Sequence, residues 1–400
     1  MYPIMKWFRD IGPGVLIAAA FIGPGTVTLC TIAGASFGYS LIWAIVLSIF
    51  STIVLQEMSL RIGLITKMNL AEVIRVNIKS KFINRLFLVL VICSILIGNA
   101  AYEAGNITGA SLGISAIINS ESINYIPIFI GLIAFIILYQ GNYKILERFL
   151  ILLVLIMSIS FFVAAIMTKP NIESLVDGVI SPEINSSNLI VLLGLIGTTV
   201  VPYNLFLHSS LVTEKWSSID KLKVARFESF FSILIGGLIS LSIIITAASV
   251  NNKDVNGVID LAKGLEPLYG KFAIYFLGIG LFASGITSSI TAPLAAAYVA
   301  KSCFGWDDSL KSQKFRAVWI IILFFGVIIS MIKLNPIEII KFAQFSNSLL
   351  LPIIAIILLW LINNKSIISS KYSYKFQNIL GSVIVIISLI LGAKGLISFI

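Results

Sequence analysis

The stretches Gly23-Pro24-Gly25-Thr26 and Val201-Pro202-Tyr203-Asn204 each interrupt an apolar run that is long enough to cross a membrane. A proline inside a helix removes one backbone hydrogen bond and clashes with the preceding turn. In lipid, the freed backbone groups are tolerated only where they face protein or a wet cavity. Breaks at corresponding points of two chain halves are typical of the binding site of a secondary transporter. Two unrelated proline kinks, which are common in membrane helices, are the alternative.

The composition indicates a polytopic membrane protein. Hydrophobic residues make up 58% and charged residues 12% of the 400 residues, whereas soluble domains carry roughly 25% charged residues. The mean hydropathy is +1.04. Cys30, Cys93 and Cys303 lie far apart in the sequence, so neither a disulfide framework nor a zinc site is indicated. The first apolar run continues well past the length of a signal-peptide core, and we expect no cleaved targeting segment.

A requirement of about 20 apolar residues per span predicts eleven membrane helices. Their approximate ranges are 12–37, 41–62, 86–117, 126–140, 149–168, 189–213, 229–250, 272–300, 317–332, 337–362 and 377–399. Most lysines and arginines fall in alternate loops, which predicts a cytoplasmic N-terminus and an extracytoplasmic C-terminus in the plasma membrane. The net charge of +10 is then an orientation signal, and no nucleic-acid partner is expected.

The eleven spans suggest an internal repeat within a single all-α transmembrane domain, residues 1–400. Spans one to five (12–168) and six to ten (189–362) each begin with a broken helix. Because five is odd, the second copy would enter the membrane from the opposite side, which makes an inverted repeat. The span 377–399 remains as one extra helix.

The sequence around both breaks resembles that of a known family. FIGPGTVTLCTIAGASFGYSLIW (21–43) is similar to the first-span signature of the Nramp family of divalent-metal transporters. VVPYNLFLHSSLV (200–212) resembles the sixth-span signature of that family, and LQEMSLRIG (55–63) and SGITSSITAPLAA (284–296) support the match. The resemblance spans nearly the whole chain. It implies a LeuT-like fold, which is a ten-helix inverted repeat plus one extra helix.

The departures from the family pattern concern the metal ligands. The first break of the family reads Asp-Pro-Gly-Asn and the second reads Met-Pro-His-Asn, and the Asp, Asn and Met bind the metal. This chain has Gly23, Thr26 and Val201 at those positions, and Tyr203 replaces the His. Transition metals require imidazole, carboxylate or thioether donors, and a Mg²⁺ site usually keeps a carboxylate. Since an uncompensated dication is costly in a low dielectric, we predict no metal site.

The remaining groups favour an anion as substrate. The first-turn N–H groups of a restarting helix lack partners and carry about half a positive charge, which makes such helix ends anion sites. The predicted substrate is a small oxyanion, bicarbonate first, although small neutral solutes such as amino acids fit the same pattern. The predicted substrate-binding residues are Gly23, Gly25, Thr26, Thr28, Thr198, Val201, Tyr203, Asn204 and Gln344.

Four further residues are candidates for the path of a coupling ion or proton. Glu103 corresponds to the second acidic residue of the family's proton-relay region, where the first acidic position is Ala100. His208, the only histidine, follows the second break and titrates near neutral pH in its ordinary state. Ser288 and Ser289 occupy a place where LeuT-like folds often bind Na⁺. For each residue the alternative is a structural role in hydrogen bonding or close helix packing.

The sequence lacks the motifs of the common enzyme classes. The chain has no HExxH, GxSxG or Walker sequence and no second histidine. We predict a secondary transporter of a small oxyanion with no cofactor beyond a coupling Na⁺ or H⁺ and no obligate protein partner. One alternative is a proton-coupled importer of a divalent metal such as Mn²⁺, Fe²⁺ or Mg²⁺. The other is a transport-inactive sensor or scaffold.

Overall fold

The computed structural model describes residues 22–118, 125–141, 144–216, 218–250, 255, 257–306, 311–332, 334–369 and 374–397, without the side chains of 144–150. Within these ranges every regular element is a helix. The longer ones are α3 (Pro24–Phe37), α4 (Ile42–Thr66), α5 (Leu70–Asn77), α6 (Lys81–Ile118), α7 (Ile126–Gln140), α8 (Lys144–Met167), α9 (Ile172–Ile180), α10 (Leu189–Thr199), α11 (Pro202–Lys215), α12 (Leu222–Ala248), α15 (Ala273–Phe304), α16 (Gln313–Ser330), α17 (Pro336–Asn363) and α18 (Lys375–Ile397). The short helices α13 (Val258–Ala262) and α14 (Glu266–Tyr269) precede α15.

Each of the eleven predicted segments coincides with a helix or, for 189–213, with the pair α10 and α11. By length and composition, eight helices formed by the described residues could cross a membrane, or nine if α8 and α9 count as one bent span. The 15 residues of α7 extend over only about 22 Å at 1.5 Å per residue. The part of the first segment before residue 22 lies outside the described residues. The count of eleven crossings and the inverted repeat therefore stay predictions.

Several helices extend beyond their predicted ranges. The predicted segment 86–117 begins at Lys81, and the predicted segment 229–250 begins at Leu222. Charged residues such as Arg85 and Arg226 lie in these added turns. Hydropathy marks only the stretch that suits lipid, whereas the backbone hydrogen bonds of a helix continue past it into water. The sequence ranges were wrong at these ends for that reason.

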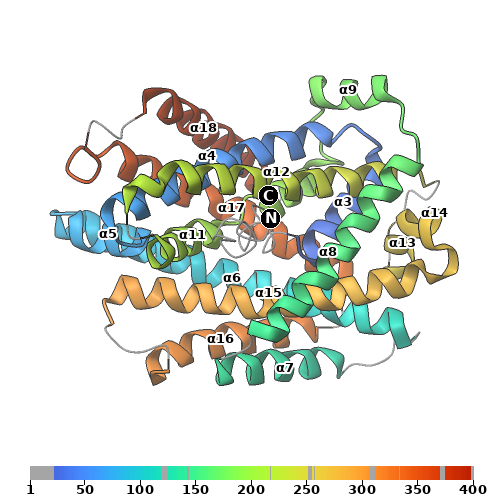
Figure 1. Ribbon diagram of the computed structural model, residues 1–400, viewed down its shortest axis with the longest axis horizontal. Helices are drawn as coiled ribbons and strands as arrows, with labels where there is room; N and C mark the ends of the chain where they lie inside the picture. The colour runs from blue at the N-terminus through green and yellow to red at the C-terminus, as the bar shows by residue number, and fades with distance from the viewer. Residues whose placement is uncertain are drawn as a thin grey trace, which may run out of the picture.

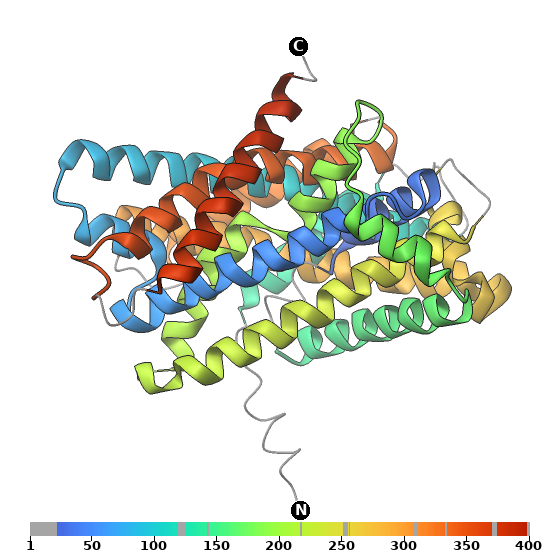
Figure 2. The same ribbon diagram turned by 90° about the horizontal axis from the view of Figure 1, so that it is seen from above.

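The helices α6 and α15 form the centre of the bundle, and α17 and α16 pack against α6 as well. Gly113 of α6 faces Gly278 of α15 so closely that a Cβ atom on Gly113 would overlap the opposite main chain. Such small residues let membrane helices approach each other. On one edge of the bundle α8 runs beside α12 (Figure 2).

Charged side chains of separate helices pair at one end of the molecule. Figure 1 shows α5 and α11 toward one end of the long axis and α9, α13 and α14 toward the other. At the former end Glu57 of α4 pairs with Arg61 at 3.2 Å and with Arg226 of α12 at 2.6 Å. Both guanidinium groups lie over the ring of Tyr374, which precedes α18. The basic segments following α4 and α11 thus meet at one end, although the direction in which the chain is inserted stays a prediction.

Candidate functional site

The structure brings the two breaks together. The helix α3 begins at Pro24 after the extended residue Gly23, and α11 begins at Pro202 after the extended residue Val201. Neither helix start has a side-chain cap. The hydroxyl oxygens of Thr26 and Thr198 lie 2.9 Å apart and are buried. This hydrogen bond joins the first turn of α3 to the last turn of α10.

The helix starts leave backbone donors at the breaks. Proline has no N–H, so it occupies the first helical position without losing a bond. The N–H of Gly25 lies in the first turn of α3, where no preceding helical turn supplies an acceptor. In α11 the N–H of Asn204 bonds to the carbonyl oxygen of Val201 at 3.1 Å, and the N–H of Tyr203 is in the position that lacks an intrahelical acceptor.

Several buried polar groups at and near the breaks have no hydrogen-bond partner. Both amide atoms of Asn204 are unsatisfied, as are the hydroxyl oxygen of Thr28 and the amide oxygen of Gln344. All three residues are at most 1% exposed. An unsatisfied buried polar group costs about 1–3 kcal/mol, and native structures satisfy nearly all of them. These groups are therefore suited to a polar ligand or to water.

Gln344 of α17 lies beside both breaks. A Cβ atom on Gly25 would lie 2.9 Å from Cγ and 2.5 Å from Cδ of Gln344. On the other side, the main-chain oxygen of Gln344 faces Gly197 of α10 so closely that no Cβ would fit. The predicted substrate residue Gln344 thus contacts the two half-helices from the neighbouring α17.

The two serines predicted for coupling face different neighbours. Ser288 faces the first break, because its hydroxyl oxygen is 3.4 Å from the position of a Cβ on Gly23. The hydroxyl oxygen of Tyr102 is 3.8 Å from the same point. Ser289 is fully buried, and its hydroxyl lies beside the carboxyl group of Glu103. Of the two serines, Ser288 therefore has the contact with the break.

Glu103 is enclosed between helices. It is fully buried, and its Oε2 accepts a hydrogen bond of 3.2 Å from the amide of Asn106 one turn later. Its Oε1 makes no hydrogen bond of good geometry, although the Ser289 hydroxyl of α15 lies beside the carboxyl group. On its other side Gly326 of α16 leaves no room for a Cβ against the Glu103 side chain. The assignment of Glu103 to a proton or ion path stays a prediction.

His208 connects α11 to α4. Its Nδ1 is 2.8 Å from the amide oxygen of Gln56, and both side chains are buried. The hydrogen bond fixes the half-helix α11 after the break against a neighbouring helix. The contact gives His208 a structural role, and its assignment to a proton path stays a prediction.

Tyr102 is a residue of the site that sequence reasoning missed. Its ring meets that of Tyr203 edge to face with centroids 5.6 Å apart, and its hydroxyl faces Gly23. The two tyrosines thus connect the first break to the second. The sequence signal that could have identified Tyr102 is its position next to Glu103, which is a candidate for the coupling path.

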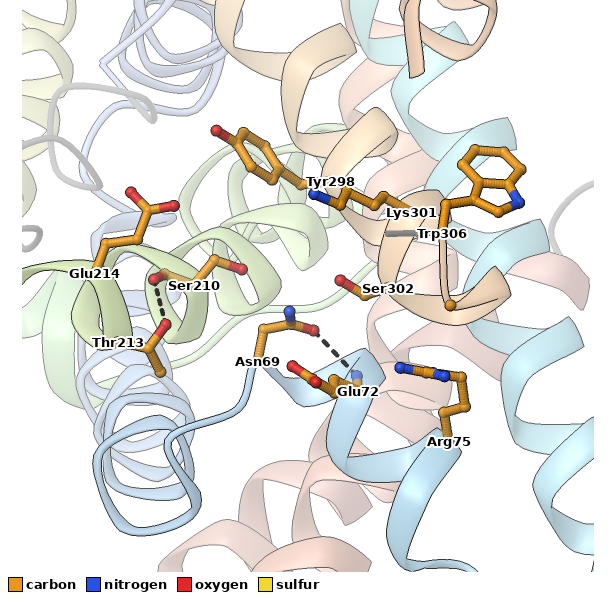
Figure 3. A pocket seen from close by; sticks show the side chains of 11 residues that line it. Asn69, Glu72, Arg75, Ser210, Thr213, Glu214, Tyr298, Lys301, Ser302 and Trp306 are labelled. Atoms are coloured by element: carbon orange, nitrogen blue, oxygen red, sulfur yellow. Dashed lines mark hydrogen bonds between the residues drawn. The ribbon is translucent and has the colours of Figure 1, made fainter. Parts of the chain in front are cut away.

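A polar pocket of about 340 Å³ opens where α5, α11 and α15 meet. Figure 3 shows Ser210, Thr213 and Glu214 of α11 on one side and Arg75 and Lys301 on the other. The last turns of α11 reach this pocket, while its first turn forms the second break. The pocket is thus a candidate aqueous entrance at the end where the basic segments meet. No residue of this pocket was predicted, because its charges lie on three separate elements.

Acidic and soft metal ligands do not converge at the breaks. Among the described residues no group of three or more His, Cys, Asp or Glu side chains could hold a metal ion. The polar groups at the breaks are hydroxyl groups, carboxamide groups, the main-chain N–H groups at the starts of α3 and α11, and the main-chain carbonyl groups at the end of α10. Such a set is neutral and can both donate and accept hydrogen bonds.

Comparison with known proteins gives the family. The model of the family described as "Natural resistance-associated macrophage protein-like" matches residues 14–398. The divalent metal cation transporter MntH of Caldanaerobacter subterraneus subsp. tengcongensis is 24% identical over 408 residues, with 99% of this chain and 94% of the relative covered. The metal transporter nramp1 homolog of Dictyostelium discoideum is 31% identical over 319 residues, with 74% of this chain and 58% of the relative covered.

Solved structures show the same fold at lower identity. A manganese transporter of Eremococcus coleocola superposes with a TM-score of 0.78 at 19% identity, covering 98% of this chain and 87% of that chain. Mhp1, a nucleobase-cation-symport-1 family transporter, superposes with a TM-score of 0.58 at 14% identity, covering 96% of this chain and 92% of that chain. With a match over nearly its full length, the chain belongs to the Nramp family of membrane transporters, has a LeuT-like fold and is not an enzyme.

Proposed function

We propose that this secondary transporter binds its substrate between the breaks of α3 and α10–α11, and that the substrate is a small oxyanion, bicarbonate first. The observation that carries the proposal is the donor set at the breaks. It consists of neutral groups, and no cluster of metal-ligating side chains occurs among the described residues. An anion gains from two uncapped helix starts, whereas a dication would find no carboxylate among the described residues at positions 23–26 and 201–204. The carboxyl group of Glu103 lies within electrostatic range of Tyr203.

The hydrogen-bonding pattern suits bicarbonate in particular. Bicarbonate carries one O–H donor and several oxygen acceptors. Asn204 offers an unsatisfied donor and an unsatisfied acceptor on one buried amide, and Gln344 offers an unsatisfied acceptor. A ligand that both donates and accepts would satisfy these groups together. A bare cation would satisfy only the oxygens and leave the amide N–H of Asn204 unpaired.

The second candidate is proton-coupled import of a divalent metal, which was the alternative from the sequence. The relatives support it, because they are named as divalent metal cation or manganese transporters. At identities of 24–31%, a change of substrate within the family is compatible with the fold. The two candidates differ in the sign of the charge that the breaks must stabilise.

Uptake into proteoliposomes tests the proposal. Purified protein is reconstituted with a pH dye trapped inside, and vesicles are exposed to bicarbonate or Mn²⁺, with protein-free vesicles as the control for CO₂ leak. The expected result is protein-dependent alkalinisation with bicarbonate and no response to Mn²⁺. Acidification with Mn²⁺ would instead support metal–proton symport and contradict the anion proposal. No response to either ion would favour the transport-inactive alternative.

One variant connects the transport to the site. Thr26→Val removes the hydroxyl that bonds to Thr198 and keeps the shape of the side chain. We expect bicarbonate transport to fall about tenfold, the equivalent of roughly 1.4 kcal/mol. The matched control is Thr291→Val, because the Thr291 hydroxyl bonds only to the carbonyl oxygen of Thr287 in its own helix. Equal transport by both variants would exclude a substrate role for the Thr26 hydroxyl.

A further inference from the structure

The helix α9 differs in direction from the spans around it. It follows α8 after Lys169, which has a left-handed backbone (φ 46°), and is bent by 115° from α8. Asn171 begins it by accepting hydrogen bonds from the main-chain N–H groups of Glu173 at 2.8 Å and Ser174 at 3.2 Å. Figure 1 shows α9 at the rim of the molecule, at the end opposite α5. The described lysines near this end are Lys169 before α9 and Lys263 and Lys271 beside α13 and α14.

The side chains of α9 divide into three faces at 100° per residue. The first face consists of Ser174, Leu175 and Gly178, which are buried or half-buried against the protein. The second face is apolar and exposed, with Ile172 at 75%, Val176 at 50%, Val179 at 39% and Ile180 at 67%. The third face carries the exposed acids Glu173 and Asp177. One face of α9 thus packs on the protein, and the two exposed faces differ, one being apolar and the other acidic.

Packing fixes the rotation of α9. Gly178 lies directly against the main-chain oxygen of Tyr39, in the turn that joins α3 to α4. A side chain at Gly178 would overlap this main chain, so the glycine lets α9 lie directly on the turn. Because the buried face is held in this way, the apolar face cannot turn inward. Four large apolar side chains therefore remain exposed on one side of α9.

The apolar face of α9 continues a surface that suits lipid. The last turns of α8 expose Ile159 at 61%, Phe162 at 46% and Ile166 at 62%, and α8 meets the length and composition of a membrane span when it is counted together with α9 as one bent pair. After the bend, the exposed apolar side chains resume at Ile172. Amphipathic helices that lie in the plane of a membrane bury an apolar face at the boundary of headgroups and acyl chains.

We propose that α9 lies in the interfacial layer of the bilayer, with its apolar face toward the acyl chains and its acidic face toward water. The acids agree with this placement, because they lie on the face that turns away from the acyl chains. The end that carries α9 is the one predicted to be extracytoplasmic, where basic residues are depleted. The partner of this surface is thus a lipid interface, and the proposal is independent of which ion is transported.

Site-specific fluorescence tests the placement. Cys93 is the exposed cysteine, whereas Cys30 and Cys303 are buried, so Cys93→Ser provides a background for labelling. Val176→Cys and Asp177→Cys then place an environment-sensitive dye on adjacent residues of α9 that belong to different faces. The protein is reconstituted at low density into phosphatidylcholine vesicles. Quenching is measured with iodide in the water and with nitroxide-labelled lipid in the bilayer.

We expect the dye at position 176 to be quenched several-fold more by the lipid nitroxide than by iodide, and the dye at position 177 to show the reverse. Equal quenching of both positions by iodide would overturn the proposal, since α9 would then lie in water. Protection of position 176 from both quenchers, lost in nanodiscs that hold one protein each, would also overturn it. That result would mean that a second copy of the chain covers the apolar face.

Discussion

Replacing Gly25 with alanine tests whether the close contact between α3 and Gln344 shapes the site. The added Cβ would lie 2.9 Å from Cγ and 2.5 Å from Cδ of Gln344. Rotating only the amide would not remove the contact with Cγ, because χ1 sets the position of that atom. Either the whole side chain must change rotamer or α17 must shift. Gly392→Ala in α18 is the matched control, because its Cβ would meet nothing closer than 3.5 Å and it is not one of the predicted substrate-binding residues.

The size of the effect follows from the cost of overpacking. Extra methyl groups in a well-packed interior cost about 1–3 kcal/mol, which corresponds to roughly 5–150-fold in an equilibrium constant. Helix propensity favours alanine over glycine by about 0.5–1 kcal/mol inside a helix. Helix propensity would thus stabilise the alanine variant, so a lower stability of Gly25→Ala cannot come from propensity. We expect the loss in thermal stability, in substrate affinity, or in both.

A double-mutant cycle separates the contact from other effects. Gln344→Ala removes the atoms that a Cβ on Gly25 would meet, so adding Gly25→Ala to it should cost little further. Unfolding midpoints in detergent and apparent KM values, measured with whichever ion the wild type transports, are compared across the cycle. Contacting residues typically show interaction energies of about 0.5–3 kcal/mol. Additive losses, or a Gly25→Ala variant equal to Gly392→Ala, would refute the reasoning.

Three other predictions follow from particular contacts. Gly197→Ala would drive a Cβ into the main chain of α17 and should abolish monodisperse folded protein in size-exclusion chromatography, while Gly392→Ala, whose nearest new contact is 3.5 Å, should behave like the wild type. His208→Leu leaves the buried Gln56 amide unsatisfied and should destabilise by about 1–3 kcal/mol, whereas the double variant with Gln56→Leu should recover most of the loss in thermal unfolding. Gly23→Asp has room for its Cβ and should lower bicarbonate transport tenfold or more, about 1.4 kcal/mol, while creating measurable Mn²⁺ binding. Unchanged bicarbonate transport by this last variant would contradict the proposed anion site.

The starts of α3 and α11 could be predicted because their signals are local. Pro24 and Pro202 are the first residues of α3 and α11, where proline fits without losing a hydrogen bond. The apolar segments identified the helices for a similar reason, since burial in lipid is a property of each segment alone. Both signals are contained in a few consecutive residues, and no tertiary contact is needed to interpret them.

The neighbours of the site could not be predicted in the same way. The bond between His208 and Gln56 joins residues 152 positions apart, and it depends on how α11 is rotated against α4. The contact of Gln344 with Gly25 likewise depends on the depth of α17 beside the break. The sequence named these residues as candidates or omitted them, but no local pattern specifies which pairs meet. Tertiary packing decides those contacts.

The proposed selectivity depends on the sign of the charge at one helix start. An uncapped helix N-terminus carries about half a positive charge, and a carboxylate placed on it would make the sum negative. With Gly23 at the start of α3, this position carries no carboxylate, and the described atoms within 4 Å of a Cβ there are the hydroxyl oxygens of Ser288 and Tyr102. One fold can thus present a cation site or an anion site at the same break. On this proposal the backbone geometry that relatives share supplies the affinity for an anion once the carboxylate is absent, and no new cationic side chain is required.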